Sequence, residues 1–181
     1  MLGCLGVFVL LVVANIMPFI DPLSFRCIDI ETAAEQKGPK GKIGQTVKLS
    51  NVAWRVTAAR RATELKAPSY PKKIGNFVIV EFLFTNNADE ATRLDSGSLT
   101  LLDSEGCEFE LGFGEVVYIA AGKNLFSIEG DIPADTKVGP GVTQDGEAIF
   151  TVDPDAKDFT LRAGDTDPFI SDENAYIELG F

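Results

Sequence analysis

Apolar and polar residues alternate along the second part of the chain with the two-residue period of β-strands. Val52, Trp54 and Val56, for example, alternate with one small and one charged residue. Because successive side chains of a strand point to opposite faces of a sheet, this pattern predicts strands with one buried face. No long stretch of the region has a clear helical period, so the pattern indicates an all-β domain.

One segment differs from this alternation. Residues 76–85 are apolar on both faces apart from Glu81, which is typical of a strand buried on both sides. We therefore expect this segment to be a central strand of the sheet. The stretch Ala58–Leu65 has a composition that helices also use, and we interpret it as the end of a strand followed by a loop.

Turn residues separate the predicted strands. Residues 99–102 and 107–111 flank Asp103-Ser104-Glu105-Gly106, which predicts a β-hairpin with Gly106 at the positive-φ position. Gly139-Pro140-Gly141 predicts another turn. Further strands are predicted at residues 116–119, 147–152, 159–162 and 176–179. Short strands with turn signals between them indicate a β-sandwich or barrel.

The N-terminal run Leu2–Ile20 has no charged side chain. A helix of this length nearly spans the ~30 Å hydrocarbon core of a bilayer, and Asp21-Pro22 ends the run abruptly. We therefore predict an uncleaved transmembrane anchor. A signal peptide cleaved near Ala14 is an alternative, although no basic residue precedes the run. A lipoprotein signal ending at Cys4 is less favoured, because no apolar stretch precedes that cysteine.

The orientation of this anchor depends on few charges. Arg26 follows the apolar run and nothing basic precedes it, so the positive-inside rule alone would place the C-terminal part in the cytoplasm. A single Arg with three acidic residues close by carries little weight in that rule. We expect a single-pass protein of the cell membrane with its domain on the extracytoplasmic side. Secretion after signal cleavage is the alternative.

The chain divides into three predicted parts. Residues 1–20 are the transmembrane anchor or signal segment, residues 21–42 a linker or stalk, and residues 43–181 the β-domain. Within the linker, residues 31–42 are polar, contain Gly and Pro, and lack periodicity.

Charge and composition exclude several classes of function. The net charge is −11, so the surface repels nucleic-acid phosphates and we expect no nucleic-acid partner. The chain contains no His, which rules out Ser-His-Asp and Cys-His catalysis within it. We expect a protein that is not an enzyme and has no cofactor. An enzyme that uses only paired carboxylates, as glycosidases do, is the least favoured alternative.

One acidic group is a weak candidate for metal binding. Asp165, Asp167, Asp172 and Glu173 place four carboxylates within nine residues, and clustered oxygen ligands favour hard cations such as calcium. Their spacing is not that of an EF-hand loop. A solvated acidic loop is the simpler interpretation.

Two other features involve cysteines and basic residues. Cys27 and Cys107 lie outside the apolar run and could form a disulfide in an oxidising compartment, which would tie the stalk to the domain. Two unpaired thiols are the alternative. The adjacent basic pairs Arg60-Arg61 and Lys72-Lys73 are interpreted as solvated loop charges.

A set of motifs occurs in a fixed order: an early strand, a central strand ending in Asn, an Asp-x-x-Gly hairpin, a Pro-Gly turn and a penultimate strand. They are Val52–Val56, Phe77–Asn86, Leu101–Gly106, Val138–Gly141 and Glu147–Val152. This order resembles the telokin-like, immunoglobulin-like domains of unknown function found on secreted and membrane-anchored bacterial proteins, which are similar in fold to an immunoprotective extracellular antigen. The resemblance covers residues 43–181, with Tyr118–Lys137 departing from it as an enlarged loop. It implies an immunoglobulin-like fold and supplies no catalytic residues.

These observations predict an all-β protein: an immunoglobulin-like β-sandwich preceded by one N-terminal apolar helix, transmembrane or signal. The membrane is the first expected partner, through residues 2–20. The function predicted for this layout is a non-catalytic interaction or adhesion module that contacts a protein or another envelope component. The alternative is a secreted protein that binds calcium or a small ligand.

Overall fold

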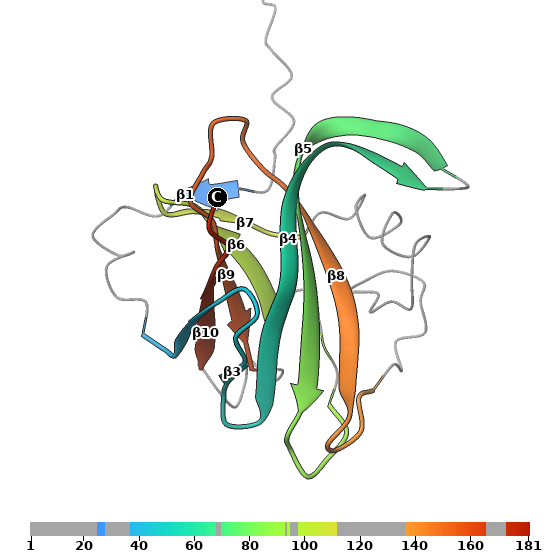
Figure 1. Cartoon of the computed structure of the whole chain (residues 1–181), viewed down its shortest axis with the longest axis vertical. Coiled ribbons are helices and arrows are strands. Elements are labelled where there is room, and N and C mark those ends of the chain that lie inside the picture. Colours follow the sequence, from blue (N-terminus) through green and yellow to red (C-terminus); the bar gives the residue numbers. More distant parts are fainter. Residues whose placement is uncertain are drawn as a thin grey trace, which may run out of the picture.

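The computed structural model describes residues 25–27, 37–67, 70–92, 94, 98–111, 137–165 and 173–181. These residues contain no α-helix, and their strands form a six-stranded and a four-stranded sheet (Figure 1). The strands are β1 (Phe25–Cys27), β2 (Lys40–Lys42), β3 (Val47–Lys48), β4 (Val52–Ala67), β5 (Tyr70–Asn86), β6 (Leu99–Leu102), β7 (Cys107–Phe109), β8 (Thr143–Thr151), β9 (Thr160–Gly164) and β10 (Asn174–Glu178). The sheet orders are β1-β7-β6-β9-β10-β2 and β3-β4-β5-β8. The prediction of an all-β sandwich is therefore confirmed.

The hydrophobic core lies between the two sheets. Alternate residues of β4 and β5, such as Val52, Trp54 and Phe84, point inward and are fully buried. Leu101 of β6 and Leu161 of β9 meet them from the other sheet. β5 pairs with β4 on one side and β8 on the other, so the prediction that residues 76–85 form a central strand is confirmed.

Trp54 links the two sheets with a polar contact as well as apolar packing. Its indole Nε1 donates a hydrogen bond to the carbonyl oxygen of Gly164 at 3.1 Å. The ring lies edge-on to Phe84, with ring centroids 5.0 Å apart. A buried indole N–H needs such a partner, because leaving it unpaired away from water costs free energy.

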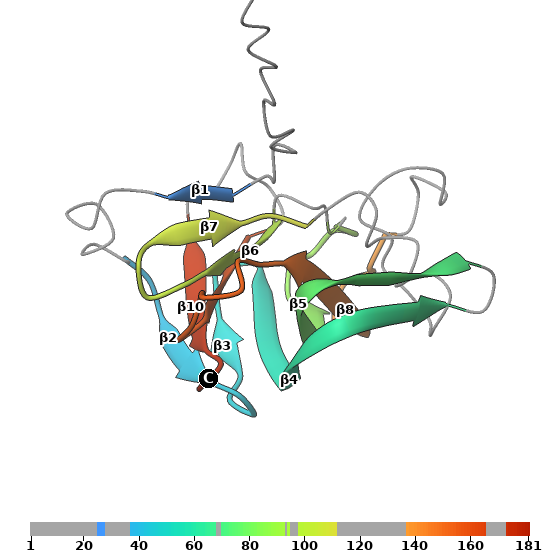
Figure 2. The same ribbon diagram turned by 90° about the horizontal axis from the view of Figure 1, so that it is seen from above.

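The β4–β5 hairpin is much longer than the sandwich that it belongs to. The two strands pair from Val52↔Asn86 to Ala67↔Tyr70, whereas β8 reaches only as far as Phe77 of β5. Beyond that point the hairpin bends away and projects as a two-stranded ribbon (Figures 1 and 2). We call residues 60–76 of this hairpin the arm.

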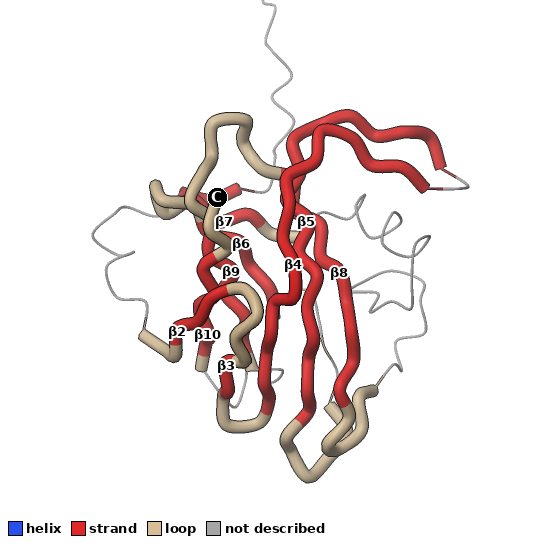
Figure 3. Tube along the Cα trace, in the orientation of Figure 1, coloured by secondary structure: helices blue, strands red, loops and turns tan. Residues whose placement is uncertain are grey.

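The interpretation of Ala58–Leu65 as a strand end and loop was wrong, because these residues are strand throughout (Figure 3). The register between β4 and β5 shifts at Val56/Ala58, Ala62/Glu64 and Leu65/Ala67. The first shift places one extra residue in β4, and the other two each place one extra residue in β5. An extra residue exchanges the two faces of the strand that contains it, so the two-residue pattern of β4 is interrupted after Val56.

A second apolar cluster lies on the opposite face of the four-stranded sheet. It consists of Leu65, Phe77, Ile79 and Ile149, all buried, with Ala62 packed against them. Three strands contribute to it, and it fastens the start of the arm to the body of the sheet. This explains why the central segment is apolar on both faces.

The first strands of the chain form both edges of the six-stranded sheet. β1 pairs antiparallel with β7, and β2 pairs parallel with β10. The predicted linker or stalk, residues 21–42, thus contributes these two short strands to the sheet. Lys40-Gly41-Lys42 carries no apolar side chain, and it joins the sheet through main-chain hydrogen bonds, which leave no apolar signal in the sequence.

The predicted hairpin at residues 99–111 is confirmed in β6 and β7. Asp103 Oδ1 accepts hydrogen bonds from the backbone N–H groups of Glu105 and Cys107, both at 2.9 Å, and Gly106 takes a φ of 79°. The other confirmed strands are β8, β9 and β10, of which β8 begins at Thr143, before the predicted residue 147.

Two predicted elements lie outside the described residues: the apolar helix at residues 2–20 and the strand at residues 116–119. In the part of the chain that the structure describes, no helix has the length and apolarity to span a membrane.

Candidate functional site

Two members of the predicted acidic group lie side by side. Asp165 directly follows β9 and Glu173 directly precedes β10, and these neighbouring strands are antiparallel. The backbone N–H of Asp165 donates to the carbonyl oxygen of Glu173 at 3.1 Å. Asp167 and Asp172 lie in the connection between them, outside the described residues.

Both carboxylates are engaged by the turn between β3 and β4. The backbone N–H of Ser50 donates to Glu173 Oε2 at 2.9 Å, and Ser50 Oγ donates to Oε1 at 3.0 Å. Asp165 is only 4% exposed, and its carboxylate accepts a hydrogen bond from Asn51 Nδ2 at 3.0 Å. These bonds join a turn of the four-stranded sheet to the six-stranded sheet.

The hydrogen bonds from Ser50 also affect the ionisation of Glu173. The backbone N–H and the hydroxyl of Ser50 both stabilise the charged carboxylate, and together they lower the pKa of Glu173 below its ordinary value. The Glu173 carboxylate therefore holds the start of β10 to the turn between β3 and β4.

Among the described residues, no group of three or more Asp, Glu or Cys side chains is arranged to hold a metal ion. Because Asp167 and Asp172 are outside that set, calcium binding by the acidic group stays a prediction.

A cavity of 630 Å³ opens beside Glu173. Its volume falls in the range of small-ligand pockets. It is lined by Lys37, Gly38, Pro39, Lys48, Leu49, Ser50, Glu173 and Asn174. Gly38 is required here, since a Cβ on its backbone would lie 1.9 Å from the carbonyl oxygen of Asn174. Two lysines, the Glu173 carboxylate and the Ser50 hydroxyl line this recess together with apolar surface.

A second cavity, of 330 Å³, lies at the turns that connect β6 to β7 and β8 to β9. Its lining combines four carboxylates with a small apolar patch: Asp103, Glu105, Asp153 and Asp155 with Cys107, Phe109 and Ala156. Cys107 is disulfide-bonded, and its Cα is paired in register with the Cα of Cys27 on β1.

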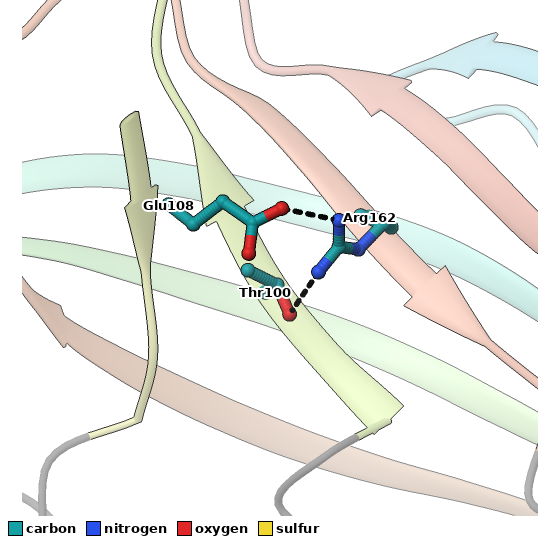
Figure 4. A network of polar contacts seen from close by, with 3 residues as sticks. All are labelled: Thr100, Glu108 and Arg162. Carbon is teal, nitrogen blue, oxygen red and sulfur yellow. Dashed lines mark hydrogen bonds and ion pairs between the residues drawn. The ribbon is translucent and has the colours of Figure 1, made fainter. Parts of the chain in front are cut away.

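A polar network crosses three strands of the six-stranded sheet (Figure 4). The guanidinium of Arg162 on β9 donates from Nη1 to Glu108 Oε1 at 2.6 Å and from Nη2 to Thr100 Oγ1 at 3.2 Å. Thr100 lies on β6 and Glu108 on β7. The Arg162 and Glu108 side chains are 29% and 14% exposed, so this is a partly buried ion pair that holds three strands in register.

The arm is the feature that the sequence interpretation missed. Arg60-Arg61 and Lys72-Lys73 were interpreted as loop charges, but both pairs lie on paired strands of the same hairpin. Arg61 Nη2 donates to the carbonyl oxygen of Ala156, and its guanidinium lies 5.0 Å from the ring centre of Phe159. In the observed register Arg61 lies opposite Val78 and Lys73 lies opposite Leu65, so the two pairs occupy different levels of the hairpin.

Glu64 is the only acidic residue among residues 60–76. Its carboxylate forms ion pairs with Lys66, at 2.6 Å, and with Lys72. These hydrogen-bonded contacts lower the pKa of Glu64, and the contact with Glu64 raises the pKa of Lys66. Near them Ile74 is the most exposed large apolar residue of the described chain, at 68%.

The chain matches a known protein family. Residues 41–175 match a domain of unknown function, DUF4352, so the chain belongs to that family. No curated protein matches its sequence.

Solved structures resemble the domain in fold. The yjhA protein of Bacillus subtilis has a TM-score of 0.54 and 14% identity, covering 76% of this chain and 98% of its own. The secreted protein MPT63 of Mycobacterium tuberculosis has a TM-score of 0.53 and 12% identity, covering 79% and 98%. A functionally unknown protein of Listeria monocytogenes has a TM-score of 0.51 and 17% identity, covering 75% and 81%.

Proposed function

We propose that this chain is an extracytoplasmic, non-catalytic interaction module: an immunoglobulin-like sandwich that is held at the cell membrane by residues 2–20 and presents its surface to an envelope partner. The disulfide-bonded Cys107 carries the extracytoplasmic part of this proposal. Disulfides persist in oxidising compartments outside the cytoplasm and are rare within it, which supports the extracytoplasmic orientation over the one favoured by counting Arg26.

We further propose that Cys27 is the partner of Cys107. Their Cα atoms are directly opposite each other on antiparallel strands, which is a spacing that a disulfide can bridge. β1 begins at Phe25, only residues 21–24 after the apolar run. Four residues reach about 14 Å at most, so an anchor in the membrane would hold this end of the sandwich close to the lipid surface.

The secreted relative in fold supports an extracytoplasmic location. MPT63 is described as secreted, and its structure aligns with most of this chain. The 630 Å³ cavity beside Glu173 supports the alternative of a secreted protein that binds a small ligand.

Location and orientation are tested in intact cells with the variant Val142→Cys in a Cys4→Ser background. Because Val142 is 47% exposed and lies outside the arm, a membrane-impermeant maleimide should label this variant without lysis. Labelling only after lysis would reverse the orientation. Retention in alkali-washed membranes is expected for an anchor, whereas release of a shortened chain into the medium would show a cleaved signal.

The interaction itself is tested by crosslinking in intact cells from the same exposed position, followed by identification of the captured molecule. A specific envelope partner is expected. The ligand-binding alternative is tested by thermal unfolding with millimolar calcium, since a ligand that binds only the folded state raises its stability. A rise in melting temperature would favour the alternative.

A further inference from the structure

The charge of this protein is distributed unevenly. The arm, residues 60–76, contains five basic residues and one acidic residue, and so carries +4. The net charge of the whole chain is −11, which leaves −15 for the remainder. The basic residues of the arm are Arg60, Arg61, Lys66, Lys72 and Lys73. Arg60 and Arg61 lie at the base, where Arg60 pairs with Glu147 at 3.9 Å and Arg61 donates to the carbonyl oxygen of Ala156. Residues 63–76, which project beyond the sheet, carry three lysines and one glutamate, a net charge of +2. The average acidity of the chain therefore conceals one electropositive projection.

The arm also carries an apolar side chain in a suitable place for interfacial binding. Glu64 and Ile74 are directly paired across the two strands, and Glu64 contacts Lys66 and Lys72. Ile74 is thus flanked by two lysines whose side chains are 74% and 50% exposed. An exposed aliphatic residue between lysines combines the two interactions that bind interfacial segments to an anionic membrane, apolar burial and attraction of basic side chains.

The arm starts at the end of the sandwich where β1 lies. Arg61, at the base of the arm, donates a hydrogen bond to the carbonyl oxygen of Ala156. Ala156 and Cys107 line the same 330 Å³ cavity. The Cα of Cys107 is paired with that of Cys27 on β1. Figure 1 shows β1 and the arm at the same end of the molecule, with the arm extending sideways from it.

The base of the arm is also fixed in direction. The cluster of Leu65, Phe77, Ile79 and Ile149 packs it against the sheet, and Lys73 Nζ lies 5.6 Å from the ring centre of Phe77. A ribbon whose base is held in this direction can lie along the surface of the membrane that holds the proposed anchor, without reorganising the domain.

A simpler interpretation of the basic residues exists. Beyond Phe77 the strand β5 is not paired with β8, and lysines on exposed strand edges discourage pairing with other chains. That interpretation explains the charge, but it does not explain an exposed Ile74 between the lysines.

From these observations we infer that the arm binds an anionic lipid surface, with Ile74 entering the headgroup region and the surrounding lysines contacting lipid phosphates. The geometry of this inference rests on the proposed anchoring by residues 2–20. The acidic turns around Asp103 and Asp153 lie at the same end, and their repulsion from anionic lipid leaves the arm as the part of this end that approaches the membrane.

The experiment uses the full chain with the reporter substitution Ile74→Trp. Trp54 is the single native tryptophan and is fully buried, so emission from the new site can be separated from it. The protein is mixed with vesicles of phosphatidylcholine alone or of an equal mixture with phosphatidylglycerol. We expect a blue shift of the added emission, and quenching by brominated lipid, only with phosphatidylglycerol and only at low salt.

Two triple variants test the charges in the same reporter background. Lys66→Gln, Lys72→Gln and Lys73→Gln together lower the charge of the arm from +4 to +1. Lys40→Gln, Lys42→Gln and Lys48→Gln remove the same charge from β2 and β3. Each lysine near an anionic surface contributes about fivefold to the partition coefficient. The phosphatidylglycerol-dependent partition coefficient of the arm should therefore fall on the order of a hundredfold in the arm variant. The β2–β3 variant should bind like the parent. Circular dichroism and thermal unfolding verify that both are folded.

The outcomes separate this inference from the proposed anchor. Failure of the parent to float with phosphatidylcholine vesicles would contradict the anchor alone, because the phosphatidylglycerol-dependent signal is measured separately. Equal emission with both lipids, or equal losses in the two triple variants, would overturn lipid binding by the arm. A blue shift with soluble polyglutamate in the absence of vesicles would also overturn it, because the arm would then be a surface for acidic proteins.

Discussion

At the scale of single residues, the buried polar side chains organise the turns. Asn86 is fully buried at the end of β5, and its Nδ2 donates to the carbonyl oxygens of Glu90 and Val138, both at 2.8 Å. Its Oδ1 accepts from the backbone N–H of Ala88 at 2.9 Å. One amide thus satisfies two loops that are distant in sequence, and such groups are costly to change.

Asn86→Asp should test this directly. The substitution keeps the shape but sets a carboxylate oxygen against two carbonyl oxygens, so we expect a loss of about 3–5 kcal/mol in the free energy of unfolding near neutral pH. The penalty relative to wild type should shrink in acid, where the carboxyl group is protonated and can donate. Asn87→Asp, at an exposed neighbour, is the control in urea unfolding. Similar losses for both would contradict the role of Asn86.

The bonds from Ser50 to Glu173 predict a pH dependence. Because the pKa of Glu173 is lowered in the folded protein, its contribution to stability is present above the unfolded value of about 4.3 and is lost as pH falls through the folded value. Glu173→Gln should therefore destabilise the protein near neutral pH and match wild type in strong acid. Glu178→Gln, which removes only a surface ion pair with Lys42, should change little at either pH. A Glu173→Gln penalty that persists unchanged in acid would contradict this account.

At the scale of elements, most strands were predictable and the long hairpin was only partly so. The alternation in Val52–Val56 and the apolar run in Phe77–Thr85 identified the middle of β4 and β5, because burial there follows the pleat. The bulges that follow Val56 break that alternation, and the β2 strand joins through its backbone. Neither effect leaves a pattern in the side chains, so neither was predictable from one sequence.

Pairing of β5 with β8 contains one position where a side chain does not fit. Gly146 lies opposite Phe82, and a Cβ on Gly146 would be 2.5 Å from Phe82 Cζ. The ring cannot move away, because it is buried against Trp54. Gly146→Val should therefore cost about 1–3 kcal/mol by overpacking, despite the higher strand propensity of Val.

The matched control for Gly146→Val is Asp145→Val, which adds a Val at the exposed neighbouring position. The free energy of unfolding of Asp145→Val, measured in urea, should be nearly that of wild type. Adding Phe82→Leu to Gly146→Val should recover part of the loss, because the smaller side chain makes room. Strictly additive losses would show that the ring contact is not the cause.

At the scale of the whole molecule, the candidate sites depended on contacts that no short motif records. Asp165 and Glu173 were predicted as a group, but their partners Ser50 and Asn51 come from more than a hundred residues away. Net charge alone gave an incomplete description, since the arm differs in sign from the rest of the chain. Both features required knowing which distant strands are neighbours.

The proposed disulfide predicts a stability effect on the whole domain. A bond between Cys27 and Cys107 closes a long loop in the unfolded chain, so Cys27→Ser should cost about 2–5 kcal/mol. Cys107→Ser, or reduction of the parent, should give the same loss, and combining them should add nothing further. Cys4→Ser is the control and should unfold like the parent. A smaller loss for Cys27→Ser than for Cys107→Ser would assign the partner elsewhere.

The pairing of β2 with β10 has a consequence for when the domain can fold. Residues 40–42 begin the main body of the chain, yet their hydrogen-bonded neighbours are residues 176–178, almost at its end. The β4–β5 hairpin is local and can form early, whereas the six-stranded sheet must wait for its last strand. If the chain is exported N-terminus first, as the proposed orientation requires, β2 crosses the membrane well before β10, and the six-stranded sheet closes only after β10 has followed.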